Sequence, residues 1–146
     1  VLFRSSQVDD YGFTIKMIDW IKTNTRIDEN RIFAFGQSAG AMFLYEQVVS
    51  RQHDFAAIAI VMGNYFDCDL SSVKIERCID ERPILYPNQP VSILHIHGQM
   101  DNLVPFNGGP VGQSDDLYVK SVYDTITIIS GNSLCNFDQT LKITLL

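Results

Sequence analysis

Short apolar runs alternate along this chain with segments whose apolar residues recur every three or four positions, as on one face of a helix. This alternation limits how the chain can fold more than any other feature. Three such runs, at residues 31–36, 55–61 and 91–96, are each short enough to be a buried strand. Helix-spaced segments separate or flank them, and a helix is the usual crossover between two parallel strands. The order predicts an α/β fold with a mostly parallel sheet, formed by a single domain over residues 1–146.

Three helices are expected from caps and spacing. Asp9 and Asp10 offer an N-cap to the first, the second covers residues 41–51, and Ser121 and Asp124 have capping-box spacing at the start of the third. Their expected apolar faces consist of Phe13, Met17, Trp20 and Ile21, then Met42, Tyr45, Val48 and Val49, then Val122, Ile126 and Ile129.

Two further segments complete the expected organisation. Residues 64–90 contain three prolines and two cysteines, which indicates a long surface excursion or lid-like insertion between strands. Residues 140–145 alternate between polar and apolar side chains, so a strand is expected near the end of the sequence.

Composition narrows the possible partners. The sequence is 46% hydrophobic and 19% charged, as expected of a soluble globular chain. Its net charge of −6 opposes binding to nucleic acid or to an anionic membrane surface. No apolar stretch reaches the roughly 18 residues typical of a transmembrane helix. We therefore expect neither nucleic acid nor membrane as a partner.

The segment GQSAG at residues 36–40 matches the motif G-x-S-x-G, with a predicted strand before it and a predicted helix after it. In such a nucleophile elbow the serine, here Ser38, takes a strained backbone conformation that lifts its hydroxyl above the sheet edge. The two glycines are expected to avoid clashes across the turn. The N–H of Ala39, at the start of the helix, can donate to an oxyanion. The alternative is an ordinary Gly-Ser turn.

A nucleophilic serine needs a base, and the base needs a carboxylate to orient it. Asp101 follows the predicted strand at residues 91–96, at the end where open α/β sheets build their sites. It is the expected acid of a catalytic triad, although it could instead only cap a turn with Asn102. Asp67, Asp69 and Asp80 rank lower because they precede this strand.

A catalytic histidine is missing from the expected position. The three histidines are His53, His95 and His97, and none follows Asp101. His53 is predicted to lie too far along the helix from Ser38, and the other two alternate with apolar residues as packed strand side chains do. A second oxyanion-loop donor is also missing, and the first residues lack an initiating Met and a signal-peptide pattern. These features predict a sequence truncated at both ends.

The odd number of cysteines leaves their state open. Cys68 and Cys78 could pair with each other, which leaves Cys135 as a free thiol, a partner in an intermolecular bridge, or a residue whose partner is missing.

Taken together, these motifs resemble the polyhydroxybutyrate-depolymerase and feruloyl-esterase-like family of α/β-hydrolases, related to carbohydrate esterase family 1. The combination of G-x-S-x-G with HGQMD and PFNGG is more specific than the first motif alone. The matching stretches are residues 8–13, 27–28, 31–32, 36–42, 55–59, 95–101 and 104–109.

The resemblance implies a partial α/β-hydrolase fold with Ser38 as nucleophile and Asp101 as triad acid. It also implies a catalytic histidine beyond Leu146, a later partner for Cys135, and a secreted or periplasmic location. The implied reaction is hydrolysis of a carboxylic ester, without cofactor or metal. Its substrate would be a small or polymeric ester, namely a hydroxyalkanoate polyester or a feruloyl or acetyl ester of plant polysaccharide. Alone, this chain would be inactive.

Other functions also fit the sequence. One alternative is a non-catalytic binding module that retains the fold, and the missing histidine is the one feature that favours it. An acyltransferase or a peptidase could use the same elbow. Tyr65, Phe66 and Phe106 could contact an aromatic acyl group, although ordinary loop packing is the favoured interpretation.

Overall fold

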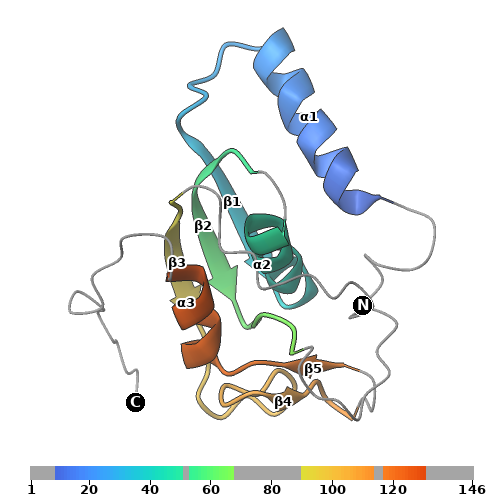
Figure 1. The fold of residues 1–146 in the computed structure, drawn as a ribbon, viewed down its shortest axis with the longest axis vertical. Coiled ribbons are helices and arrows are strands. Elements are labelled where there is room, and N and C mark those ends of the chain that lie inside the picture. The colour runs from blue at the N-terminus through green and yellow to red at the C-terminus, as the bar shows by residue number, and fades with distance from the viewer. Residues whose placement is uncertain (1–8, 51–52, 68–89, 114–116, 131–146) are drawn as a thin grey trace.

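A computed structural model describes residues 9–50, 53–67, 90–113 and 117–130. The main elements are α1 (Asp10–Asn24), β1 (Ile32–Gln37), α2 (Ala39–Ser50), β2 (Phe55–Val61), β3 (Ser92–Ile96) and α3 (Val122–Ser130). Two short strands, β4 (Gly109–Pro110) and β5 (Tyr118–Val119), precede α3 (Figure 1). The predicted strand at residues 140–145 and all three cysteines lie outside the described residues.

β1, β2 and β3 form a parallel three-stranded sheet in that order. Phe35 of β1 is in register with Ala59 of β2, which is in register with Leu94 of β3. Helix α2 joins β1 to β2 as a crossover, so the predicted α/β class with a parallel sheet flanked by helices is confirmed. Because all three strands run the same way, their carboxyl ends meet at one edge of the sheet.

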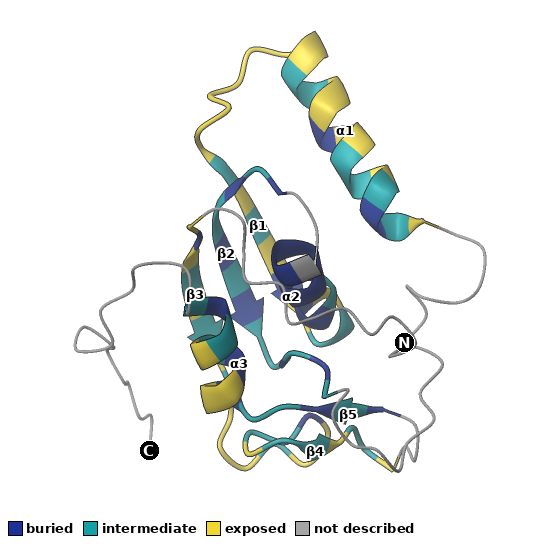
Figure 2. Cartoon of the chain, viewed as in Figure 1, coloured by how far each residue is buried: buried dark blue, intermediate teal, exposed yellow. Residues whose placement is uncertain are grey.

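The main core lies between α2 and one face of this sheet. Tyr45 and Val48 of α2 are completely buried, and they cluster with Ile58 and Ile60 of β2 and with Ile129 of α3. The predicted apolar positions of α2 are all buried, and so are its polar residues Glu46 and Gln47. Figure 2 shows α2 as the most completely buried helix of the described chain.

The predicted apolar face of α1 is wrong, although its N-cap is confirmed. The Asp9 carboxylate accepts from Gly12 N–H at 2.9 Å, but Phe13 and Trp20 are 67% and 63% exposed. The helix has a second apolar stripe that includes Tyr11 and Ile18, and this stripe is the buried one. Tyr11 stacks on Phe43 of α2 with the ring centroids 4.7 Å apart.

The three strands were expected to be buried, and only one face of the sheet meets that expectation. On the other face Phe33, Phe35, Leu94 and Ile96 are more than half exposed (Figure 2). In the described structure, the buried clusters that cover the sheet lie on the opposite face, with α2 and α3.

The predicted third helix and its capping box are confirmed in α3. Ser121 Oγ accepts from Asp124 N–H at 3.0 Å, and Val122 and Ile129 are buried. The antiparallel pair β4–β5 was not predicted. Among the described residues, no helix is long and apolar enough to cross a membrane.

The start of the predicted excursion belongs to the folded structure. Asn64 and Phe66 are buried, Lys120 N–H donates to the Tyr65 carbonyl at 2.8 Å, and Asp67 N–H donates to the Tyr118 carbonyl at 3.0 Å. Residues 64–67 therefore run beside β5, below the carboxyl ends of the sheet (Figure 1).

Candidate active site

The proposed nucleophile and acid lie at the same edge of the sheet. Ser38 directly follows the last residue of β1, and Asp101 lies in a turn shortly after the end of β3. The parallel pairing of β1, β2 and β3 brings these two positions to the carboxyl edge, two strands apart.

The backbone of Ser38 has the unusual conformation that a nucleophile elbow requires. Its φ angle is 52°, in the left-handed region that side chains other than glycine rarely adopt. The Ser38 N–H donates to the Val61 carbonyl at 2.9 Å, and its own carbonyl accepts from Met42 N–H at 3.0 Å. The turn between β1 and α2 is thus fixed on both sides, and the half-buried Ser38 stands at the sheet edge.

Two glycines make this turn possible, and only one of them was predicted. A Cβ at Gly36 would lie 2.5 Å from the Gly40 carbonyl oxygen, so a side chain there is excluded. A Cβ at Gly40 would meet nothing within 4 Å, so the predicted need for glycine there is wrong. Gly63 is the missed residue, since its Cβ would lie 2.4 Å from Ala41 Cβ and 2.8 Å from the Ser38 carbonyl oxygen.

Ala39 is the first residue of α2 and is half-buried. The first N–H groups of a helix have no partner within the helix and carry the positive end of its dipole. The position of Ala39 directly after Ser38 therefore suits the proposed oxyanion donor.

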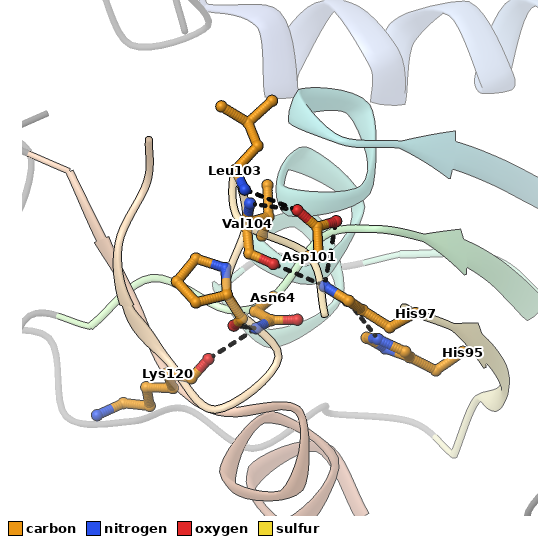
Figure 3. Close-up of polar contacts among 8 residues, drawn as sticks. Asn64, His95, His97, Asp101, Leu103, Val104 and Lys120 are labelled. Atoms are coloured by element: carbon orange, nitrogen blue, oxygen red, sulfur yellow. Dashed lines mark hydrogen bonds and ion pairs between the residues drawn. The ribbon is translucent and has the colours of Figure 1, made fainter. Parts of the chain in front are cut away.

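The Asp101 side chain is held by the turn that follows it. Its Oδ1 accepts from Leu103 N–H at 2.8 Å and from Val104 N–H at 2.9 Å. Oδ2 lies 3.7 Å from His97 Nε2, beyond hydrogen-bond distance. The side chain as a whole is 14% exposed, and Figure 3 shows its two oxygens turned to different partners, Oδ1 to the turn and Oδ2 to His97. Asp101 does cap a turn, as the alternative interpretation held, but only one carboxylate oxygen is used for this.

His95 and His97 are packed and hydrogen-bonded, as predicted. His95 Nε2 lies 3.2 Å from His97 Nδ1, and His97 Nε2 lies 2.8 Å from the Val104 carbonyl oxygen (Figure 3). The hydroxyl of Tyr45 in α2 lies 2.5 Å from His95 Nδ1. Burial is the main reason that the pKa of His95 is lowered to about 4, and the neighbouring His97 ring lowers it further because two protonated rings would repel each other.

His53 lies at the other end of the sheet from Ser38, just before the first residue of β2. It is 5% exposed, and its Nδ1 accepts from Phe55 N–H at 3.3 Å. Burial lowers its pKa, and the nearby Asp54 partly offsets this. His53 lines a cavity of about 140 Å³ with Ile15, Ile18, Asp19, Gln47, Asp54 and Phe55. This position agrees with the prediction that His53 is too far from Ser38 to act on it.

Asn64 was not singled out in the sequence, yet it is completely buried below the acid turn. Its side-chain amide donates to the Pro105 carbonyl at 3.0 Å and to the Lys120 carbonyl at 2.9 Å (Figure 3). Asn64 therefore ties the segment after Asp101 to the segment that leads into α3. Nothing in the sequence distinguishes it from the other polar residues of the predicted excursion.

The other candidate residues have structural contacts. Phe66 is buried in a second cluster with Met42, Val104, Leu117 and Val119. Tyr65 packs against the main core. The Phe106 ring makes edge contacts with His97 and Tyr123. Asp67 pairs with Lys120 at 2.9 Å, whereas Asp69 and Asp80 lie outside the described residues. These contacts agree with loop packing as the interpretation of the aromatic residues.

Possible metal ligands do not gather in the described part of the chain. No three His, Cys, Asp or Glu side chains there are placed so that they could share a metal ion.

Comparison with known proteins finds relatives whose names describe esterases. A protein of Aspergillus niger named "Probable feruloyl esterase C" is 26% identical over 102 residues, which cover 69% of this chain and 32% of the relative. The Aspergillus clavatus protein of the same name is 28% identical over 102 residues, with the same coverage. NocK of Nocardia uniformis subsp. tsuyamanensis, named as an esterase, is 27% identical over 106 residues, 73% of this chain and 27% of NocK.

The chain thus spans about a third or less of the length of these relatives. No family model matches the chain, and no solved structure gives a significant match. The esterase names and the parallel sheet flanked by helices agree with an α/β-hydrolase fold. At this level of similarity the chain resembles proteins of an esterase-like family.

Proposed function

We propose that this chain is part of the catalytic domain of a serine carboxylic-ester hydrolase that acts through an acyl-enzyme on Ser38. The left-handed backbone of Ser38, placed between β1 and α2, carries this proposal. Such strain costs about 1–3 kcal/mol and is concentrated at functional sites.

Each group has a defined role in the proposed reaction. Ser38 Oγ attacks the acyl carbon and loses its proton to a histidine, and the Ala39 N–H donates to the oxyanion that forms. The histidine then protonates the leaving alcohol, and water hydrolyses the acyl-serine by the same steps. Asp101 Oδ2 accepts from the histidine and holds its ring in place.

We place the basic histidine outside this sequence. His97 uses both ring nitrogens, for His95 and Val104, and its side chain is only 1% exposed. His95 is enclosed between Tyr45 and His97, and His53 lies at the opposite edge of the sheet. None of them can reach Ser38 without a rearrangement of its contacts. The chain alone is therefore inactive under this proposal.

The proposed substrates are feruloyl or acetyl esters of plant polysaccharide or a hydroxyalkanoate polyester, and the proposed location is secreted or periplasmic. The names of the Aspergillus relatives favour the feruloyl ester among these. Met100 and Leu103 flank Asp101 and are 87% and 61% exposed, so apolar side chains are available beside the proposed acid for an acyl group.

The test is hydrolysis of methyl ferulate and p-nitrophenyl acetate by the longer protein, by its Ser38→Ala variant and by this chain alone. Ser92 is exposed at the start of β3, so Ser92→Ala is the matched control. We expect activity in the longer protein and in Ser92→Ala, and a loss of at least about a thousandfold in Ser38→Ala. Activity that survives Ser38→Ala would mean a different nucleophile, and a folded but inactive longer protein would favour the binding module.

A further inference from the structure

We propose that Tyr45, His95 and His97 are positioning residues that link the nucleophile helix to the acid turn through one directed set of hydrogen bonds. With the Val104 carbonyl they are called the histidine network below. This inference rests on the proposed function for its catalytic meaning, but the hydrogen bonds themselves can be tested without activity.

The network crosses from one functional element to the other. Tyr45 lies on α2, the helix that begins directly after Ser38, and its hydroxyl lies 2.5 Å from His95 Nδ1 in β3. His95 Nε2 lies 3.2 Å from His97 Nδ1, and His97 Nε2 lies 2.8 Å from the Val104 carbonyl oxygen. The adjacent rings of His95 and His97 are stacked, with an interplanar angle of 10°.

The last acceptor fixes the direction of every bond. A carbonyl oxygen only accepts, so His97 must carry its proton on Nε2, and in the neutral ring its Nδ1 is then an acceptor. His95 must therefore donate from Nε2, which leaves its Nδ1 to accept from the Tyr45 hydroxyl. Both histidines are neutral Nε2–H tautomers in this arrangement, and every donor in the network has an acceptor.

Burial enforces this arrangement. Tyr45 is completely buried, and the His97 side chain is 1% exposed. In the reverse direction His95 would donate to the Tyr45 oxygen, and the hydroxyl proton would lose the acceptor that it has among the described residues. A buried donor without a partner is unfavourable. The low pKa of His95, about 4, agrees with a neutral ring near pH 7.

Val104 connects the histidine network to Asp101. Its carbonyl accepts from His97, while its N–H donates to Asp101 Oδ1 at 2.9 Å. The Val104 side chain is buried in the same cluster as Met42, whose N–H donates to the Ser38 carbonyl. The histidine network thus supplies a second connection, besides this cluster, between the Ser38 elbow and the turn that holds Asp101. Asp101 Oδ2 lies 3.7 Å from His97 Nε2, beyond hydrogen-bond distance, so the histidine network holds Asp101 through Oδ1 and Val104 and not through Oδ2.

The direct test is a ¹⁵N–¹H correlation spectrum of the imidazole groups of this chain at pH 7. We expect His95 and His97 each to carry one proton, on Nε2. The shifts of both rings should change in Tyr45→Phe and stay the same in Tyr123→Phe, the matched control on the exposed face of α3. A proton on Nδ1 of either ring, or a doubly protonated ring, would overturn the network.

The functional test uses the longer protein with methyl ferulate. His97→Leu cannot donate to Val104, and we expect kcat to fall about tenfold to a hundredfold with little change in KM. His97→Gln can donate from its amide and should recover part of kcat. If His97→Leu does not fold, Tyr45→Phe, which removes only a hydroxyl, should lower kcat severalfold. Unchanged kcat in folded His97→Leu or Tyr45→Phe would overturn the positioning role.

These tests separate the two proposals. A spectrum with the expected tautomers but no hydrolysis by the longer protein would sink the proposed function and the catalytic meaning of the network, and leave its hydrogen bonds established. Loss of activity in Ser38→Ala together with unchanged kcat in Tyr45→Phe would support the proposed function and overturn the positioning role of the histidine network.

Discussion

Met42 and Val104 belong to one buried cluster, although Met42 lies in the helix of the Ser38 elbow and Val104 lies in the turn of Asp101. Each residue also donates a hydrogen bond from its backbone N–H to a proposed catalytic residue. Met42 donates to the Ser38 carbonyl, and Val104 donates to Asp101 Oδ1. Packing of apolar side chains therefore fixes the relative position of the two proposed catalytic residues. The following predictions test this arrangement and its surroundings.

The strain at Ser38 predicts an unusual order of stability. Because its φ angle is 52°, Ser38→Gly relieves strain that Ser38→Ala keeps. We expect Ser38→Gly to have the larger free energy of unfolding, by about 1 kcal/mol. At Ser92, in an extended strand, the order should be reversed. Urea unfolding of the four variants measures both differences, and the same order at both sites would argue against a strained elbow.

Gly63 and Gly40 should respond differently to alanine. The Cβ of Gly63→Ala would press on Ala41 and on the Ser38 carbonyl, so we expect a loss of about 1–3 kcal/mol in stability. Gly40→Ala has free space and lies in α2, so we expect no loss and a gain of up to about 1 kcal/mol. Thermal or urea unfolding measures the change in stability of each variant, and equal changes in the two would contradict the close contact at Gly63.

The two faces of the sheet should differ in their tolerance of smaller side chains. Phe35 is 69% exposed, so we expect Phe35→Thr to cost less than about 1 kcal/mol. Ile58 is 2% exposed on the opposite face, and Ile58→Ala should cost about 2–5 kcal/mol. Equal losses in urea unfolding of this chain would show that the Phe35 face is covered after all.

His95 should make stability depend on pH. Its pKa is about 4 in the folded chain, below the ordinary value of 6.5, so the unfolded chain binds more protons between these values. The free energy of unfolding is therefore highest above pH 6.5 and falls as the pH decreases toward 4. His95→Gln should reduce this fall, while the contribution of His53, whose pKa is also lowered, remains. Identical pH dependence of the variant and the original chain in urea unfolding would contradict a buried neutral His95.

Sequence patterns predicted β1, β2, β3 and the strand–turn–helix order around Ser38, because short apolar runs and a Gly-rich turn depend on local constraints. They failed on α1, which carries two apolar stripes, since the choice between them depends on which stripe meets Phe43 and its neighbours on α2. Gly63, Asn64 and the partners of His95 were missed for a related reason. Their roles depend on residues far away in the sequence, such as Tyr45 and Pro105, which only the fold brings near.

The most direct measurement of the central proposal is the location of a covalent adduct. The longer protein would be treated with a fluorophosphonate, which reacts with activated serines, and the modified peptide would be identified by mass spectrometry. We predict a single adduct on Ser38, none on Ser92, and none in Ser38→Ala, with loss of methyl ferulate hydrolysis in proportion to labelling. Full labelling of a different serine in an active protein would contradict the assignment of Ser38 as the nucleophile.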